Sequence, residues 1–186
     1  MANYTDWLRL YSNDDRKHHA LRVAETAKNL AAIHGADKEK VFIAGILHDI
    51  ARDYSGKQLL ETAEQFGIVV NDSERNCPVV LHGPVAAKIA GSRLRIEDRD
   101  ILQAIHQHTL AAPAMSLVSK IVYLADVIEP GRQFKAVGEL RELARYKLDS
   151  ALLAAMDSGI NYLLGKKEII HPKTIEARNY YILHCR

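Results

Sequence analysis

The chain of 186 residues is long enough for one domain with a substantial core and too short for two. Hydrophobic residues make up 48% and charged residues 26%, which is ordinary for a soluble globular protein. The 25 basic and 23 acidic side chains nearly cancel, which argues against a nucleic-acid partner but leaves room for a local basic pocket.

Helical periodicity runs through the first half of the chain. Residues 18–34 place apolar side chains three and four positions apart, and Gly35 follows as a natural helix stop. Residues 37–50 form a second predicted helix, apolar enough to lie centrally. Ser55 can cap a third helix that ends near Gly67, and residues 69–78 are predicted as loop because Asn, Asp, Ser and Pro gather there. The segment GIVVN, residues 67–71, is the only strand candidate.

The second half of the chain is predicted to be helical as well. Helices are expected at 83–92, 97–109 and 115–128, the last stopped by EPG, and at 136–146 and 149–165. A short final helix begins in HPKTIEARNYYIL, with Pro172 in its first turn. No internal repeat or linker is visible. The predicted fold class is all-α, one domain over residues 1–186 whose helices share a core.

The cysteines and the N-terminus indicate the compartment. Cys77 and Cys185 have no CxxC spacing and do not predict a disulfide scaffold, which favours a reducing cytoplasm. No basic segment followed by an apolar one begins the chain, so no secretory signal is predicted. No apolar run approaches the ~18 residues that cross a bilayer. We therefore expect a cytoplasmic protein without a membrane partner.

Ionisable side chains interrupt the apolar faces of several predicted helices. His48 and Asp49 stand side by side at the end of an apolar run, where a buried carboxylate needs a lysine, an arginine or a metal ion beside it. His19 shares a helix face with Val23 and Leu30. A lone histidine in the place of His19 is by itself more often a core residue than a ligand, whereas the adjacent pair His48 and Asp49 favours metal ligation.

Three further side chains follow the same pattern. His108 projects to the apolar side of its helix, and His82 stands at a predicted helix start. Asp126 ends the run KIVYLAD, close to a helix C-terminus that is electrostatically poor for an anion. His18 is expected to face solvent, and His106 lies on a different helix face from His108.

Taken together, four imidazoles and two carboxylates predict a metal site, formed by His19, His48, Asp49, His82, His108 and Asp126. Imidazole with carboxylate suits iron, manganese, cobalt or zinc. Six groups exceed what one ion needs, and Asp49, beside His48, is the natural bridge between two. Two-metal sites serve phosphoryl chemistry.

The order His19, His48-Asp49, Asp126 resembles the H…HD…D pattern of HD-domain metal-dependent phosphohydrolases. Beyond this pattern, a set of segments from about residue 16 to 180 resembles the YqeK family, in the expected order: HALRVAETAKNLA, AGILHDIARDYS, LHGPVAA, HTLAAPAMSLVSKIVYLADVIEPGR and IHPKTIEARNY. Members of that family are symmetrical diadenosine tetraphosphate hydrolases with a di-iron centre. The resemblance implies a single HD-domain helical bundle, with a metal-binding core at about 16–132 and C-terminal helices at about 136–186.

The resemblance also implies a ligand set. One iron would be held by His19, His48, Asp49 and Asp126. The second would share Asp49 and be held also by His82 and His108. Iron itself follows only from the family, because the residue types alone leave manganese, cobalt and zinc open.

Further residues match family positions near the expected substrate. Arg52 stands where the family has a basic residue after HDIA, Asp53 would orient it, and Arg132 of EPGR would bind a phosphate bidentately. The expected catalytic residues are thus Asp49, Arg52, Asp53 and Arg132. The expected substrate contacts are Thr109, Arg132, His171, Arg178 and Asn179. The segment HTLAAPAM, residues 108–115, lacks the Gly- and Arg-containing run expected there, so one phosphate or nucleobase contact is not accounted for.

The implied reaction is attack of a metal-bridging hydroxide on the β-phosphorus of diadenosine tetraphosphate, which gives two ADP. The sequence shows neither a Gly-rich P-loop nor a Ser-His-Asp arrangement that would favour other chemistry. One alternative keeps the HD centre but takes nucleoside monophosphates or deoxynucleotide triphosphates. Another is a nucleotide-sensing module without turnover. A homodimer is a further expectation from the family.

Overall fold

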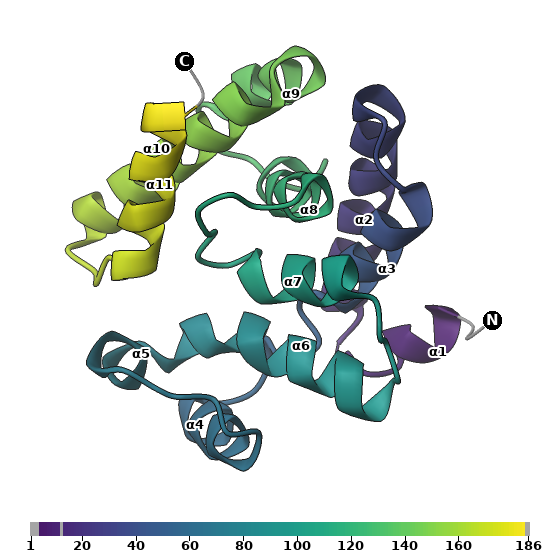
Figure 1. Ribbon diagram of the computed structural model, residues 1–186, viewed down its shortest axis with the longest axis vertical. Helices are drawn as coiled ribbons and strands as arrows, with labels where there is room; N and C mark the ends of the chain where they lie inside the picture. The colour runs from purple at the N-terminus through teal and green to yellow at the C-terminus, as the bar shows by residue number, and fades with distance from the viewer. Residues whose placement is uncertain (1–3, 12, 185–186) are drawn as a thin grey trace.

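The computed structural model describes residues 4–11 and 13–184, and every regular element among them is helical (Figure 1). In chain order they are α1 (Tyr4–Leu8), α2 (Asp14–His34), α3 (Lys38–Leu47), α4 (Gly56–Gln65), α5 (Asp72–Asn76), η1 (Pro78–Leu81), α6 (His82–Arg93), α7 (Arg99–Gln107), α8 (Leu117–Ile128), α9 (Val137–Tyr146), α10 (Leu148–Lys166) and α11 (Pro172–His184). None of the helices in this described part is both long enough and apolar enough to cross a bilayer. Cys77 is a free thiol, and Cys185 lies outside the described residues.

Helix α8 is the centre of the fold. It packs against α2, α3, α7, α9 and α10, and Figure 1 shows it between α2 and α3 on one side and α10 and α11 on the other. Its sequence, LVSKIVYLADVI, is apolar on almost every side, which is typical of a helix that others surround. Ser116 caps it by accepting a hydrogen bond from the Ser119 backbone N–H.

Helices α2 and α3 approach each other unusually closely. Gly35, with φ of 74°, ends α2, and the Asp37 side chain caps α3. A Cβ atom added at Gly45 would lie 2.7 Å from the Cα of Ala24. The missing side chain at Gly45 therefore lets α3 rest directly on α2.

The second predicted helix ends earlier than expected. It was predicted over 37–50, whereas α3 stops at Leu47 and the chain continues in turns, with the Arg52 N–H donating to the Asp49 carbonyl at 2.9 Å. Neighbouring residues of a regular helix differ by about 100° in direction. Because the helix has ended, His48 and Asp49 are both buried although they are adjacent.

The all-α fold class is confirmed, and the predicted helices are present with small shifts at their ends. The predicted loop at 69–78 is wrong in part, since it contains α5 and the first residue of η1, and the described segment 67–71 forms no strand. Helix α5 is a single turn whose polar composition resembles a loop, and a capping box between Asn71 and Glu74 stabilises it. Helix α11, expected to be short, has 13 residues, and α1 was not predicted.

The C-terminal helix supports the loop that follows α7. The Met115 N–H donates to the Tyr181 hydroxyl at 3.0 Å, and the Thr174 hydroxyl donates to the Leu110 carbonyl at 3.2 Å. Ala111 and Ala114 in this loop have positive φ, 60° and 49°, where glycine is usual. Helix α11 therefore holds the atypical segment 108–115 in place.

Filling the contact between α2 and α3 should destabilise the fold. We expect Gly45→Ala to lower the free energy of unfolding by about 1–3 kcal/mol, because the new methyl group meets the backbone of Ala24. Gly138→Ala is the matched control, since an added Cβ there meets nothing within 4 Å and a helix favours alanine. Urea unfolding followed by circular dichroism measures both variants. Equal stability of the two would contradict the close approach of α2 and α3.

Candidate metal centre

The six side chains of the predicted metal site converge at one point inside the fold. They come from α2, the turn after α3, the first residue of α6, the end of α7, and α8: His19, His48, Asp49, His82, His108 and Asp126. All are buried except Asp126, which is half-buried. The segments that carry them are far apart in the sequence, so the helical packing creates the cluster.

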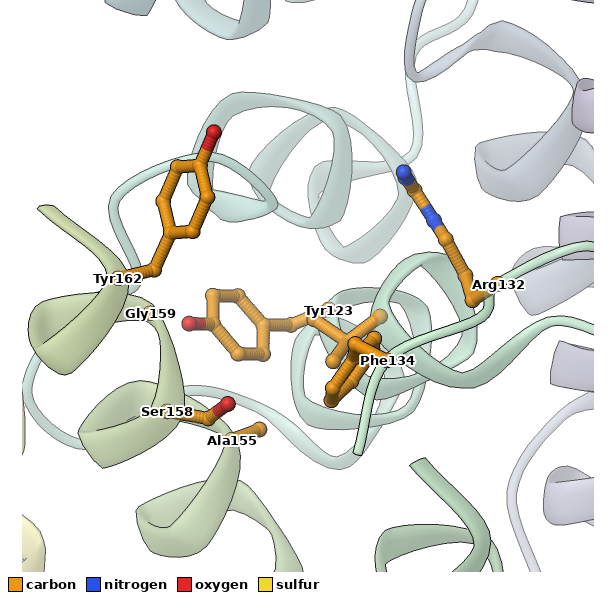
Figure 2. Close-up of a pocket in the computed structure, with 8 residues that line it drawn as sticks. Tyr123, Arg132, Phe134, Ala155, Ser158, Gly159 and Tyr162 are labelled. Atoms are coloured by element: carbon orange, nitrogen blue, oxygen red, sulfur yellow. The ribbon is translucent and has the colours of Figure 1, made fainter. Parts of the chain in front are cut away.

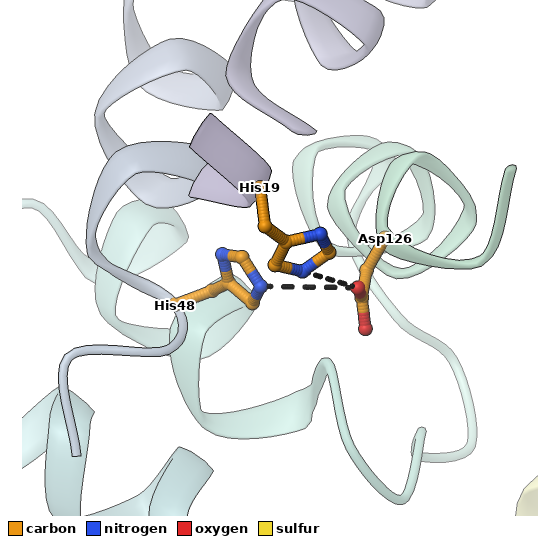
Figure 3. Close-up of side chains that lie close together, drawn as sticks. All are labelled: His19, His48 and Asp126. Carbon is orange, nitrogen blue, oxygen red and sulfur yellow. Dashed lines mark ion pairs between the residues drawn. The ribbon is translucent and has the colours of Figure 1, made fainter. Parts of the chain in front are cut away.

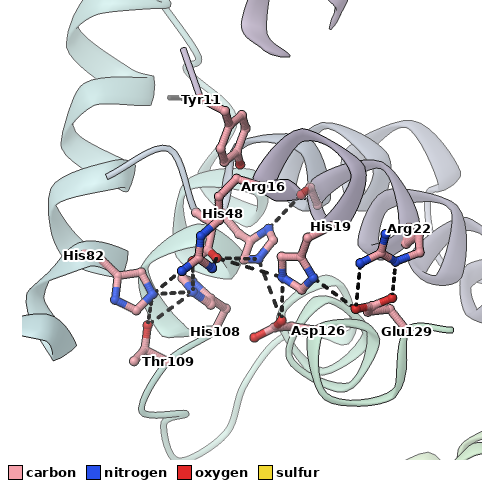
Figure 4. Close-up of polar contacts among 12 residues, drawn as sticks. Tyr11, Arg16, His19, Arg22, His48, His82, His108, Thr109, Asp126 and Glu129 are labelled. Atoms are coloured by element: carbon pink, nitrogen blue, oxygen red, sulfur yellow. Dashed lines mark hydrogen bonds and ion pairs between the residues drawn. The ribbon is translucent and has the colours of Figure 1, made fainter. Parts of the chain in front are cut away.

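The four histidine rings of the cluster lie close together (Figure 4), and the Asp49 carboxylate is within 4 Å of each of them. Its Oδ1 atom is 3.1 Å from the Nε2 atom of His82 and 3.5 Å from that of His108. Its Oδ2 atom is 3.9 Å from the Nε2 atom of His19 and 3.7 Å from that of His48. Each carboxylate oxygen therefore faces a different pair of histidines.

Asp126 completes one of the two groups. Its Oδ1 atom is 3.0 Å from the Nε2 atom of His19 and 3.9 Å from that of His48 (Figure 3). In the set His19, His48 and Asp126 the potential ligand atoms lie within 4.8 Å of one another, and the same holds for His48, Asp49 and His108. Such spacing allows one cation to contact every member of a group.

The outer nitrogen of each histidine ring is anchored by an acceptor. The Nδ1–H groups of His48 and His108 donate to backbone carbonyls at 2.7 Å, each belonging to the residue three positions earlier. His82 donates in the same way to the Val79 carbonyl, and His19 donates to the Glu129 carboxylate at 3.1 Å. These bonds assign the tautomer that leaves every Nε2 lone pair directed inward, as metal-binding histidines require.

Several inward-facing nitrogens lack a protein donor. The Nε2 atoms of His19 and His48 are buried and make no hydrogen bond, which is unfavourable for a polar atom. The Nε2 atoms of His82 and His108 are 3.0 Å apart, so two acceptors face each other unless a proton or a cation lies between them. The donor set fits metal ions, because a cation would satisfy these lone pairs together.

Burial and neighbouring charges shift the pKa values of several groups in the cluster. Burial lowers the pKa of His48 to about 4 and also lowers the pKa of His82, so both rings are neutral near pH 7. Burial alone would raise the pKa of Asp49, but the neighbouring rings of His48, His108 and His82 outweigh it and hold this pKa well below the ordinary value. The carboxylate is therefore ionised beside the neutral rings of His48 and His82. Burial lowers the pKa of His108, but its contact with Asp49 outweighs this and raises that pKa above the ordinary value.

Glu129 anchors the site from behind, and the sequence analysis used it only as part of a helix stop. Its carboxylate is 2% exposed and accepts hydrogen bonds from the His19 ring, the Arg22 guanidinium and the Gly131 N–H. Burial tends to raise the pKa of Glu129, but these donors, Arg22 first, lower it. A glutamate directly after the apolar run of α8 was the available signal.

The cluster opens into a cavity of about 250 Å³ whose walls carry three arginines, Arg16, Arg52 and Arg132. Arg16 was not predicted from the sequence. Its guanidinium lies 3.3 Å from both the Asp49 Oδ2 and the Asp53 Oδ1 atoms. The expected orientation of Arg52 by Asp53 stays a prediction. Arg16 lies three residues before His19, on the same face of α2, and this spacing could have identified it.

Two of the expected substrate contacts lie at this cavity. The Thr109 hydroxyl is 3.2 Å from the Nε2 atoms of both His82 and His108. Arg132 donates to the carboxylate and the carbonyl of Asp126 at the cavity wall. Their contact with a phosphate stays a prediction.

The structure does not bring the other three expected contacts to the cavity. His171 is buried at the start of α11, where its ring lies 3.4 Å from the Glu74 carboxylate. Arg178 donates to Asp157 at 2.7 Å, and it lines with Asn179 a different cavity between α10 and α11. Contact of these three residues with a nucleotide stays a prediction, and their positions in the structure do not support it.

An all-α fold with these histidines and aspartates gathered at one point defines an HD-domain protein. The profile of the HD domain family matches residues 16–131, and the chain belongs to this family. A crystal structure from Clostridium acetobutylicum, described as a predicted HD superfamily hydrolase involved in NAD metabolism, matches with a TM-score of 0.94 and 41% identity, over 97% of this chain and 95% of that one.

Within the HD-domain proteins, the chain is a member of the YqeK family. It is 37% identical over 170 residues to a protein of Halalkalibacterium halodurans named bis(5'-nucleosyl)-tetraphosphatase, symmetrical, covering 91% of this chain and 90% of the relative. A Bacillus subtilis protein of the same name is 34% identical over 164 residues, covering 88% of each chain. The family resemblance predicted from the sequence is confirmed.

Removing the charge behind His19 should weaken metal binding without unfolding the protein. We expect Glu129→Gln to reduce metal affinity about 10–100-fold, because the neutral amide is a poorer acceptor for the His19 Nδ1–H. Competition with a chelator for Mn²⁺ measures this affinity. Glu25→Gln, which removes only an exposed ion pair with Lys28, is the control. Unchanged affinity in Glu129→Gln would show that Glu129 does not position the ligand.

Proposed function

We propose that the protein hydrolyses diadenosine tetraphosphate symmetrically to two ADP at a two-metal site built around Asp49. The observation that carries the proposal is the division of this carboxylate, whose two oxygens face different histidine pairs. The substrate is supported by the relatives named symmetrical bis(5'-nucleosyl)-tetraphosphatase, which match about nine tenths of the chain.

The proposed ligands are those that the sequence predicted. One metal would be held by His19, His48, Asp49 and Asp126, and the other by Asp49, His82 and His108. Iron is the proposed metal from the family resemblance, and the same donors suit manganese, cobalt or zinc. Two metals bound there would lower the pKa of a water molecule and stabilise charge on the phosphoryl oxygens.

The arginines of the cavity would bind the polyphosphate chain. Arg16, Arg52 and Arg132 carry fixed positive charges, and a guanidinium fits two phosphate oxygens at once. The Asp53 carboxylate contacts the Nε atom of Arg16. This contact orients the Arg16 guanidinium toward the cavity. Thr109 offers a hydroxyl beside the second histidine pair. These residues give a nearly neutral protein a local site for a highly anionic substrate.

The second histidine pair distinguishes the proposal from its alternatives. An HD nucleotidase or deoxynucleotide triphosphohydrolase with one metal needs only the H…HD…D set, whereas His82 and His108 provide further ligands around the other oxygen of Asp49. A sensing module without turnover would have no need of this second pair. A homodimer, the absence of nucleic-acid and membrane partners, and a cytoplasmic location stay predictions from the sequence.

Two neighbouring histidines of one segment test the second metal. We expect His108→Ala to bind about one metal per chain where the unmodified protein binds about two, with loss of hydrolysis, because one ligand of the second site is gone. His106→Ala is the control, since His106 is exposed at the end of the same helix. Anaerobic purification followed by mass spectrometry of the metals gives the count. Two metals retained in His108→Ala would refute this ligand assignment.

Isotope labelling tests where the substrate is cleaved. Hydrolysis of diadenosine tetraphosphate in oxygen-18 water should give ADP as the only product, with the label on the β-phosphate of half the molecules, because water attacks one of the two central phosphorus atoms. Chromatography and mass spectrometry identify the products. ATP together with AMP would mean asymmetrical cleavage and would overturn the proposed function.

A further inference from the structure

A second cavity adjoins the metal cavity and has a different chemical character. It measures about 430 Å³ and lies between α8, α10 and the segment after α8. Tyr123, Val127 and Arg132 line both cavities, so the two are neighbours that share a wall. The metal cavity is surrounded by charged and polar groups, whereas the second cavity is mostly apolar.

Aromatic rings and small side chains form the walls of this second cavity (Figure 2). The Tyr123 ring projects from α8 toward α10, with Phe134 and Tyr162 also at the cavity. On α10, Ala155, Ser158 and Gly159 lie at three- and four-residue spacing on one face and leave space beside Tyr162. An added Cβ at Gly159 would meet nothing within 4 Å.

Such walls suit a flat aromatic ring. Nucleobases stack on tyrosine and phenylalanine faces, and each base stacked on an aromatic side chain gains binding energy without needing a specific edge. A volume of about 430 Å³ lies in the range of small-ligand pockets. The hydroxyl groups of Tyr123 and Ser158 both lie at the α10 side, where they can meet the polar edge of a base.

The two cavities together match the two parts of a nucleotide. The phosphates of a nucleotide would bind the metal cluster and the arginines. The base, which the ribose separates from the phosphates, needs an apolar cavity beside them. Arg132 stands where the two cavities meet, so a phosphate bound there leaves its nucleoside facing the second cavity. We propose that this cavity, formed by Tyr123, Phe134, Tyr162 and the small residues of α10, binds one adenine of the dinucleoside substrate. The inference rests on the proposed function and assigns helix α10 a direct part in recognising the substrate.

The proposal is tested by filling the cavity and comparing two ligands. Gly159→Leu should weaken ADP binding at least about tenfold, because the leucine occupies the place of the base. Pyrophosphate, which has no base, should bind as tightly as it does to the unmodified protein, and the metal content should not change. Gly165→Leu is the matched control, on the same helix, exposed, and away from the cavity. Isothermal titration calorimetry of the metal-loaded protein measures both ligands.

A second pair of variants keeps the test independent of how Gly159→Leu folds. Tyr162→Ala should also weaken ADP binding selectively, whereas Tyr146→Ala, whose side chain is exposed on α9, should not. The inference is wrong if both Gly159→Leu and Tyr162→Ala bind ADP as tightly as the unmodified protein does, provided that the unmodified protein converts diadenosine tetraphosphate to ADP. In that case the base binds elsewhere. If the unmodified metal-loaded protein forms no ADP from the tetraphosphate, it is the proposed function that fails.

Discussion

The Asp49 carboxylate, shared between two pairs of histidines, is the contact on which the rest of the site depends. A buried carboxylate is unfavourable unless positive groups surround it. Here the nearest side chains are imidazoles whose outer nitrogens already donate to fixed acceptors, and Arg16 reaches only one of the oxygens. The protein thus concentrates acceptors at its centre and leaves the balancing charge to bound cations.

The fold keeps this arrangement rigid through close helix contacts. Gly45 lets α3 rest on α2, and a Cβ at Gly83 would lie 3.0 Å from the Thr109 hydroxyl and 3.0 Å from the His106 carbonyl. The first contact brings His19 to the turn that carries Asp49, and the second brings His82 to His108. Three of the rings donate a hydrogen bond to the backbone carbonyl three residues earlier. This local contact fixes the orientation of each ring at the beginning or end of its helix. The helix contacts and these local hydrogen bonds therefore position the ligands together.

Much of this could be predicted from the sequence. Helical period and helix stops located the long helices, because each buries one face against its neighbours. The six clustered side chains were recognisable together, since each lies at the inner edge of a predicted helix. The boundary between the metal-binding core and the C-terminal helices stays a prediction.

Other features depend on long-range packing that periodicity does not encode. Arg16 and Glu129 were missed because an arginine or a glutamate at a helix end usually faces solvent, and only the three-dimensional arrangement buries Glu129 behind His19. The end of α3 at Leu47 could not be seen, because apolar residues resume at Ile50 and Ala51 directly after His48 and Asp49. Likewise, the family resemblance at the C-terminus did not indicate where the Arg178 side chain points. In the structure Arg178 pairs with Asp157 of α10, away from the metal cavity.

Anomalous diffraction from crystals of the anaerobically purified protein tests the central claim most directly. Two peaks at the absorption edge of the bound metal should flank the Asp49 carboxylate, one among His19, His48 and Asp126 and the other beside His82 and His108. A single peak, or peaks away from Asp49, would contradict a two-metal centre that this carboxylate joins.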